Sequence, residues 1–215
     1  MSSEMVCPYM YVHLLIVSFH PGTEPISVEQ ANSIPVHGYE EVKLTITSHV
    51  GTHIDLPSHM KVGAENISTA PVSKYYGPAI KVDVRHVSGL INIEDLKPFE
   101  ETISKSDFLI LQTGHDQYFG SDQYFEGFPV LSPDAASYII KVNPDIKGVG
   151  MDCISPDPCD TTTFDIHHIL FNHNMVIIEN LKDLDAIPSN VFTFAGFPMH
   201  IENGDGSPIR AVAIV

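Results

Sequence analysis

The sequence predicts a strand-heavy α/β fold, and three observations support this prediction. Short segments rich in Val and Ile recur along the 215 residues, and most are bounded by Gly, Pro, Asn or Asp, as strands commonly are. Helical patterns are fewer. No GxGxxG motif opens a helix after the first strand, which disfavours a Rossmann fold. At roughly 150 residues per domain, this length predicts a single domain over residues 1–215.

The expected strands begin near the N-terminus and continue to the C-terminus. In one of them Val42, Leu44 and Ile46 alternate with polar residues, so we expect one face of this strand to be buried and the other to be polar. The full set is Val12–Val17, Val42–Ile46, Ala79–Val84, Phe108–Leu111, Gly148–Met151, Met175–Ile178, Phe192–Phe194 and Ile209–Val215.

Three segments carry helical signals. Ser132 is an expected N-cap, followed by Pro133 at the first helical position and an acidic first turn. The segment Phe164–Asn172 fits a short helix after the Thr161–Thr163 capping cluster. A further helical turn is expected over Ile93–Pro98.

The composition describes a globular, acidic protein. The hydrophobic share is 43% and the charged share 18%, which is enough apolar material for a sizeable core. Lys and Arg number 11 against 27 Asp and Glu, a formal net charge of −16. Nucleic acids and anionic membrane surfaces both attract basic proteins, so this balance argues against either partner.

The cysteines and the apolar N-terminal segment predict a cytoplasmic location. Cys7, Cys153 and Cys159 form no CxxC pair, so we expect neither a disulfide framework nor a thiolate zinc site. The segment Tyr9–Phe19 lacks a basic flank and a cleavage site, and it is too short to span a bilayer. We interpret it as a buried strand.

The 12 His residues outnumber Lys and Arg together, and three of them lie in one short segment. His49, His53, Asp55 and His59 have the spacing H-x3-H-x-D-x3-H. Gly51 and the β-branched neighbours oppose a helix here, as does the proline two residues before His59. In an extended chain His53, Asp55 and His59 point to one side, while the apolar residues between them face the core. A turn at Gly51 would let His49 rejoin this group.

This residue set is typical of a catalytic metal site. Two imidazoles and a carboxylate, from His49, His53 and Asp55, leave coordination positions open for water. His59 is then available as a general acid or base beside the metal.

The motif resembles the signature H-x-G-T-H-x-D-x-P-x-H of the cyclase family of metal-dependent hydrolases, which includes bacterial-type kynurenine formamidase (arylformamidase) and isatin hydrolase. The resemblance runs along nearly the whole chain, and its weaker motifs follow in the family's order. These are Pro21-Gly22, Thr113-Gly114, Gly150-Met151-Asp152, Ile178-Glu179-Asn180-Leu181 and the segment Gly206–Ala213.

The resemblance implies a set of site residues. His49, His53 and Asp55 match the ligands of a first metal, with Asp55 able to bridge to a second. His167 and Glu179 match the second-site ligands, with His168 as the neighbouring alternative to His167 and His173 as a less favoured one. The strand-end position of Glu179 supports its role independently, because a core-adjacent carboxylate needs a partner. His59 matches the family's general acid/base.

The resemblance also bears on the substrate. Formamidases of this family carry a Trp before the Pro-Gly near the N-terminus, whereas this chain has no Trp and places His20 there. His20 offers less stacking area and adds a hydrogen-bonding tip, so it is a candidate substrate-binding residue. A small amide, lactone or imide is then as good a candidate substrate as N-formylkynurenine.

Other polar residues are expected to have lesser roles. Asp152 and Asp157 are expected to organise loops, and Arg210 to form an ion pair or to contact an acidic substrate group. His115 and His200 are expected at the surface. The segment Gly204-x-Gly206 lacks the Lys and the helix of a phosphate-binding loop, and Cys153 has no sequence-local base.

Together these observations predict a metal-dependent hydrolase of an amide, formamide, cyclic imide or ester bond, acting on carbon–nitrogen bonds other than peptide bonds in the manner of an arylformamidase. The resemblance implies a swivelling β/β/α fold with mixed sheets and few helices, one or two Zn or Mn ions per subunit, and a homo-oligomer, either a dimer or a tetramer. The segment 19–24 is the part expected to reach a neighbouring subunit. The alternative is a non-catalytic module on the same scaffold that binds metal or a small molecule.

Overall fold

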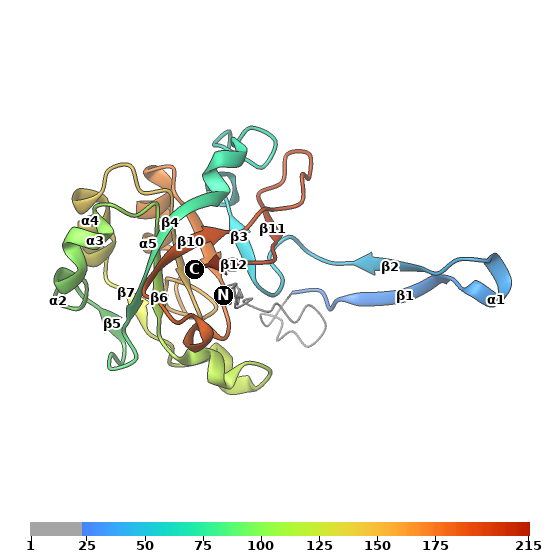
Figure 1. Ribbon diagram of the computed structural model, residues 1–215, viewed down its shortest axis with the longest axis horizontal. Helices are drawn as coiled ribbons and strands as arrows, with labels where there is room; N and C mark the ends of the chain where they lie inside the picture. The colour runs from blue at the N-terminus through green and yellow to red at the C-terminus, as the bar shows by residue number, and fades with distance from the viewer. Residues whose placement is uncertain (1–22) are drawn as a thin grey trace, which may run out of the picture.

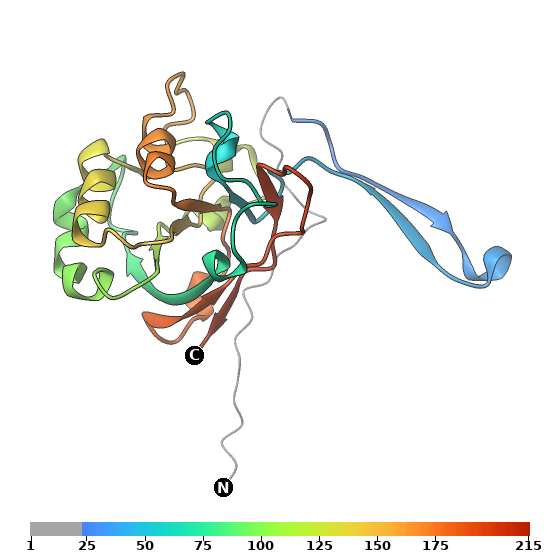
Figure 2. The same cartoon turned by 90° about the horizontal axis from the view of Figure 1, so that it is seen from above.

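The computed structural model describes residues 23–215, which form a curled mixed sheet with helices packed on one side and a long hairpin on the other (Figures 1 and 2). The predicted α/β class with few helices is confirmed. The strands are β1 (Ser27–Asn32), β2 (Glu41–Thr45), β3 (His53–Asp55), β4 (Tyr76–Asp83), β5 (Leu90–Ile91), β6 (Phe108–Gln112), β7 (Val130–Leu131), β8 (Gly148–Met151), β9 (Val176–Glu179), β10 (Val191–Ala195), β11 (Gly206–Pro208) and β12 (Val212–Ile214). The α-helices are α1 (Ile34–His37), α2 (Ile93–Leu96), α3 (Glu100–Ile103), α4 (Pro133–Val142) and α5 (Asp165–Asn172), and short 3-10 turns connect several elements.

The main sheet has eight strands in the order β11-β3-β9-β8-β6-β4-β10-β12. Its centre is parallel, with β4, β6, β8 and β9 running the same way, and β3, β10, β11 and β12 complete both sides in antiparallel pairs. A parallel strand must return through a crossover, and α4 and α5 occupy the crossovers that lead into β8 and β9. The sheet is therefore buried on both faces at its centre.

The alternation of side chains in the central strands separates two cores. In β6, Leu109 and Leu111 face the core beneath the helices, whereas Phe108 and Ile110 face the inside of the curl. The second core is closed by β3 and the C-terminal strands, including Ile54 and Phe194. Strands buried on both faces are nearly continuous hydrophobic runs, which is why these segments were predictable from their composition.

The helix predictions are confirmed in position, and one is wrong in its cap. Ser132 accepts a hydrogen bond from the backbone N–H of Ala135 at 3.1 Å and begins α4. At α5 the free N–H groups of Ile166 and His167 donate to the carboxylate of Asp157, at 2.9 and 3.0 Å. Thr161 accepts hydrogen bonds from the N–H groups of Thr163 and Phe164, just before the helix. The cap of α5 is therefore Asp157, from the preceding loop, and not the Thr161–Thr163 cluster.

The hairpin of β1 and β2 extends far from the sheet in both views, with α1 at its tip (Figures 1 and 2). We call residues 27–45 the arm. The predicted strand at Val42–Ile46 exists, but the prediction of a buried face is wrong: Val42 and Leu44 are 53% and 58% exposed. Their cross-strand partners Gln30 and Val28 share that face and are exposed with them.

Three further expectations concern the two ends of the chain and the possibility of a membrane span. The predicted C-terminal strand Ile209–Val215 is shorter, because only Val212–Ile214 pairs with β10. The predicted strand Val12–Val17 lies outside the described residues. Within residues 23–215, no helix combines the length and the apolar character needed to cross a membrane.

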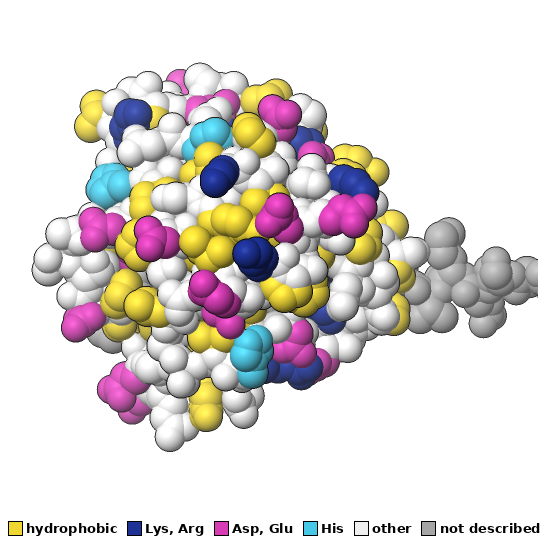
Figure 3. All heavy atoms as spheres, turned by 90° about the vertical axis from the view of Figure 1, so that its left-hand side faces the viewer, with side chains coloured by type: hydrophobic (Ala, Val, Ile, Leu, Met, Phe, Trp, Pro, Cys, Tyr) yellow, Lys and Arg dark blue, Asp and Glu magenta, His cyan; other side chains and the backbone are white. Residues whose placement is uncertain are grey.

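The side of the molecule that carries the helices has a mixed surface. Figure 3 shows acidic and basic side chains interspersed there among polar and hydrophobic ones. The net charge of −16 is therefore not gathered into one acidic patch on this side.

Candidate metal centre

Two adjacent strands bring the first three polar side chains of the site together. His53 and Asp55 lie two residues apart in β3 and so project from the same face. The register of β3 with β9 pairs His53 with Glu179, the last residue of β9. His53 Nε2 lies 3.2 Å from Asp55 Oδ1 and 3.3 Å from Glu179 Oε2, and all three side chains are buried.

A turn at Gly51 returns His49 to this group, as the sequence predicted. Gly51 has a φ of +62°, a left-handed conformation that glycine adopts without steric cost. His49 Nδ1 then lies 2.6 Å from Asp55 Oδ1. Gly206 on the neighbouring strand β11 leaves room for the ring, because a Cβ at that position would lie 2.6 Å from His49 Cε1.

The helix α5 supplies His167. Its Nε2 lies 3.6 Å from Glu179 Oε1, and its Nδ1 lies 2.6 Å from Asp157 Oδ2. The two alternatives are placed elsewhere: His168 is exposed on the next position of the helix, and His173 lies 2.7 Å from the carbonyl oxygen of Pro144. The structure therefore brings His167, and neither alternative, to Glu179.

These side chains form two groups with the chemistry of metal ligands. One group is His49, His53 and Asp55, and the other is Asp55, His167 and Glu179; the ligand atoms within each group lie within 4.8 Å of one another. Nitrogen and carboxylate oxygen in threes suit a catalytic divalent cation such as zinc or manganese. Asp55 belongs to both groups, so its two oxygens could serve two ions.

The other ring nitrogen of each imidazole is held by the protein, as metal-binding His residues require. His53 Nδ1 lies 2.8 Å from the carbonyl oxygen of Gly51, and that oxygen also accepts a hydrogen bond from the Asn180 side chain at 3.0 Å. Asp157 holds His167, and Asp205 holds His49 at 2.8 Å from Nε2. The residues present therefore fit a metal centre both in ligand type and in the groups that orient the ligands.

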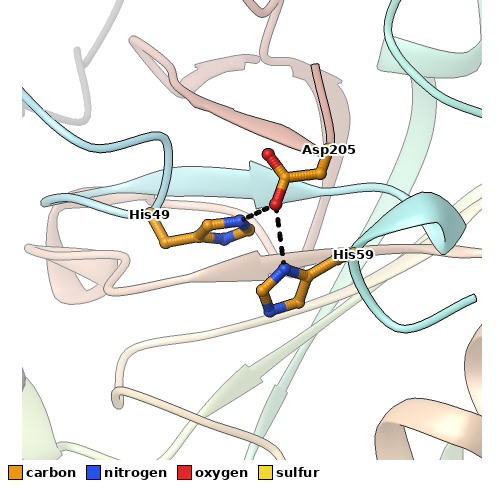
Figure 4. A group of neighbouring side chains, drawn as sticks. All are labelled: His49, His59 and Asp205. Atoms are coloured by element: carbon orange, nitrogen blue, oxygen red, sulfur yellow. Dashed lines mark hydrogen bonds and ion pairs between the residues drawn. The ribbon is translucent and has the colours of Figure 1, made fainter. Parts of the chain in front are cut away.

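The backbone conformation at His59 differs from the extended chain that the sequence predicted. His59 ends a 3-10 turn, Pro57–His59, rather than an extended strand, because the proline fixes its own φ and begins the turn. The ring of His59 packs against that of His49, with centroids 3.9 Å apart and ring planes tilted by 35°, and its Nδ1 lies 3.1 Å from Asp205 Oδ2 (Figure 4).

The charges in the site shift the pKa values of its imidazoles in opposite directions. Burial alone would lower the pKa of His49 and of His167, but the carboxylates around them outweigh burial and raise these values to about 9 and about 10. Burial and the neighbouring charge of His49 lower the pKa of His59. The imidazoles that face carboxylates thus hold protons that a cation would displace, while His59 is neutral and able to accept a proton.

The candidate ligands and His59 line a cavity of about 500 Å³. Most of the other side chains that line it are apolar or carry a hydroxyl group. Besides the candidate ligands and His59, the lining residues are Thr23, Thr47, Val50, Gly51, Met60, Phe128, Ile154, Ser155, Pro158, Cys159, Thr161, Phe164 and Asn180. Two of them, Thr23 and Thr47, lie where the arm leaves the body of the molecule.

The remaining predicted residues lie away from the ligands. Asp152 accepts hydrogen bonds from Thr113 and Gly114 and has the expected loop role. The prediction of an exposed His115 is wrong: it is buried, with Nε2 3.0 Å from the carbonyl oxygen of Tyr124. His200 is exposed, as predicted.

Three other predictions concern an arginine, a cysteine and a substrate contact. Arg210 is exposed, and no ion pair joins it to another residue of the described range 23–215; the alternative expectation, a contact with an acidic substrate group, stays a prediction. Cys153 is buried, and burial raises the pKa of its thiol, which opposes a nucleophilic role. The candidate substrate contact His20 lies outside the described residues.

Comparison with known proteins places the chain in a family. The model of the Cyclase family, described as "Putative cyclase", matches residues 17–158. A kynurenine formamidase from Bacillus cereus is 33% identical over 193 residues, which cover 89% of this chain and 88% of that protein. The chain belongs to the cyclase family.

Solved structures share the fold of this cyclase-family chain. An isatin hydrolase bound to the product analogue thioisatinate superposes with a TM-score of 0.81 at 22% identity, covering 99% of this chain and 92% of that one. A protein from Bacillus stearothermophilus described as a predicted metal-dependent hydrolase gives a TM-score of 0.72 at 25% identity, covering 87% of this chain and 86% of that one. The likeness to the isatin hydrolase shows the fold.

Sequence reasoning missed two carboxylates of this cyclase-family site. Asp157 was expected only to organise a loop, yet it holds both the start of α5 and the ring of His167. Asp205 lies between Gly204 and Gly206, a segment for which the sequence only excluded a phosphate-binding loop. An acidic residue flanked by two glycines immediately before a strand was the available signal, because glycines permit a close backbone approach.

Proposed function

We propose that this cyclase-family chain works as a single domain and is a metal-dependent hydrolase that cleaves an amide, formamide, cyclic imide or ester bond of a small molecule. One observation carries the proposal. Two three-residue groups of metal-ligand type share Asp55 and line one cavity, and the imidazole of His59, whose pKa is lowered by burial, lies beside them. An open cavity above a set of three ligands is typical of catalysis rather than of a closed structural site.

The residues divide the chemistry between binding and proton transfer. His49, His53 and Asp55 would hold one divalent cation, and Asp55, His167 and Glu179 a second. Such a cation, when bound, acts as a Lewis acid that polarises a carbonyl group and lowers the pKa of a water molecule. His59 accepts a proton from the attacking water and donates it to the leaving nitrogen or oxygen.

The cavity favours a small substrate with an apolar body. Its walls combine Phe128, Phe164 and aliphatic side chains with a few hydroxyl groups, and its volume of about 500 Å³ is in the range of small-molecule sites. The names of the relatives, kynurenine formamidase and isatin hydrolase, point to aromatic amides and imides. An amide or imide attached to a single ring system is therefore the first substrate class to test.

A substrate panel tests this proposal. Formanilides, isatin-like imides and lactones are incubated with protein reconstituted with Zn²⁺ or Mn²⁺, with metal-free protein, and with the His59→Ala variant. We expect hydrolysis of at least one class by the reconstituted protein only, and a loss of roughly 10²- to 10⁴-fold in the variant. Bound metal with no turnover of any panel member would favour the alternative of a binding module.

The arm supports an assembly of at least two copies. Its pairs Val28–Leu44 and Gln30–Val42 share one face, and the apolar members of this face are exposed, as are Ile34 and Val36 at the tip. An isolated two-stranded hairpin is marginally stable in water, so this face needs a cover. A second copy of the chain is the proposed occupant, because two-fold pairing buries both arms at once and homo-oligomers predominate among soluble assemblies. Thr23 and Thr47, which flank the arm, also line the cavity, so the arm begins beside the candidate site.

A further inference from the structure

The loop before β11 places one carboxylate between two imidazoles of the site. Asp205 Oδ2 lies 2.8 Å from His49 Nε2 and 3.1 Å from His59 Nδ1 (Figure 4). The backbone fixes this position, because the carbonyl oxygen of Asp205 accepts a hydrogen bond from the N–H of Leu56 at 2.9 Å. Leu56 lies between β3 and the turn that carries His59. This hydrogen bond therefore holds the loop of Asp205 against both of these segments.

The contacts with Asp205 decide which ring nitrogens carry protons. An ionised carboxylate only accepts hydrogen bonds, so each nitrogen that faces it must be an N–H donor. His49 is thereby protonated at Nε2 and directs Nδ1 towards Asp55. Whenever the His59 ring is neutral, the contact with Asp205 keeps its proton on Nδ1, which leaves the lone pair of Nε2, on the opposite side of the ring, to accept a proton.

We infer that Asp205 is a positioning residue of this site: it fixes the tautomer and ring orientation of the acid/base His59 while it orients the ligand His49. The inference rests on the proposed function for the role of His59, but the geometry of the three side chains stands without it. Asp157 provides the comparison within the molecule. It holds His167 by the same kind of contact, at 2.6 Å, and its carboxylate otherwise accepts hydrogen bonds from the backbone at the start of α5.

A competing role for Asp205 is that of a metal ligand, since His49, His59 and Asp205 also satisfy the spacing of a three-ligand group. The two roles differ in what a substitution removes. If Asp205 positions His59, then Asp205→Asn keeps the full complement of ions at saturating metal but weakens the control over the tautomer and ring orientation of His59. If Asp205 is a ligand, the variant loses an ion.

The first experiment uses metal-free protein and no substrate. Nitrogen-15 NMR of the histidine rings reports which nitrogen of His59 is protonated, with His59→Ala assigning its signals. We expect the Nδ1–H tautomer in the parent protein and a shift towards Nε2–H in Asp205→Ala. The matched control is Asp95→Asn, which breaks an Asp–His pair with His86 outside the cavity and should leave the His59 signals unchanged. Unchanged His59 signals in Asp205→Ala would overturn the inference.

The second experiment is a double-mutant cycle on the metal-loaded enzyme. Asp205→Asn should lower kcat by about 10- to 100-fold with little change in KM, the range typical of groups that orient metal-site residues. In the His59→Ala background the same substitution should cost less than about threefold more, because its main effect passes through the missing ring. If the kcat losses of the two single variants multiply in the double variant, or if Asp205→Asn loses an ion, the positioning role is contradicted. If the parent hydrolyses no panel member, the proposed function fails, and the NMR result still decides the inference.

Discussion

The arm and the strand β3 carry the same alternation of side chains, yet the structure buries one and exposes the other. In the arm, Val42 and Leu44 alternate with polar residues and are 53% and 58% exposed. In β3 and the residue that follows it, Ile54 and Leu56 alternate with the candidate metal ligands His53 and Asp55 and are fully buried, at 0% exposure. Alternation therefore predicts which side chains share a face. Whether anything covers that face depends on the rest of the fold, or on another molecule.

The largest expected effect tests the polar face of β3. Asp55→Asn keeps the size of the side chain but removes the charge that both ligand groups share. We expect it to lose both ions and at least about 10³-fold in kcat/KM, equivalent to about 4 kcal/mol. Metal analysis and steady-state kinetics measure these losses. Glu41→Gln, an exposed carboxylate in the arm, is the control; a fully active, metal-replete Asp55→Asn would remove Asp55 from the site.

A matched pair of substitutions tests the apolar faces. Ile54→Ala should lower the free energy of unfolding by about 2–5 kcal/mol, because it opens a cavity in the core inside the curl. Leu44→Ala should change it by no more than about 0.5 kcal/mol in dilute, monomeric protein, because Leu44 is exposed in the single chain. Denaturant titrations measure both values. Equal losses would break the comparison between the two strands.

A charge on the arm tests what covers its apolar face. Leu44→Asp should weaken self-association by about 2 kcal/mol or more, as the loss of a buried interface residue does. Light scattering over a range of protein concentrations measures the change. Thr45→Asp adds the same charge on the polar face of the same strand and should associate like the parent. A parent protein that is monomeric at all concentrations would refute the assembly.

The smallest expected effect is a release of protons when metal binds. The metal-free site raises the pKa of His49 to about 9 and of His167 to about 10, so both rings are protonated at pH 7 and must lose their protons to bind a cation. Metal affinity should therefore weaken as the pH falls from about 9 towards 6. In metal-free protein the same shifts stabilise the fold below the unfolded pKa of 6.5, and this stability is lost as the pH rises through about 9 to 10. Calorimetry of Zn²⁺ binding in two buffers of different ionisation enthalpy counts the protons; no release at pH 7 would contradict the shifts.

The sequence predicted those parts of the site that depend on local geometry. His53, Asp55 and the turn at Gly51 follow from strand periodicity and glycine conformation, and Glu179 follows from the end of an apolar run. The central strands were predictable because strands buried on both faces have a distinctive composition.

Long-range contacts decided what could not be predicted. Asp205 is 156 residues from His49 and 146 from His59 along the chain, and only the pairing of β11 with β3 brings them together. The same holds for His115, whose burial depends on the chain that packs over it, and for Asp157, which folds back onto α5. The exposed arm shows the converse, because a correct local pattern gave a wrong expectation of burial.

The central claim is that hydrolysis depends on cations held around Asp55. Metal-free protein titrated with Zn²⁺ or Mn²⁺, while the hydrolysis rate of a responsive panel substrate is followed against bound metal per chain, tests it most directly. We predict no turnover without metal and a rate that rises with occupancy to a plateau at one or two ions per chain. A full rate in the metal-free protein, or a rate independent of occupancy, would contradict the claim.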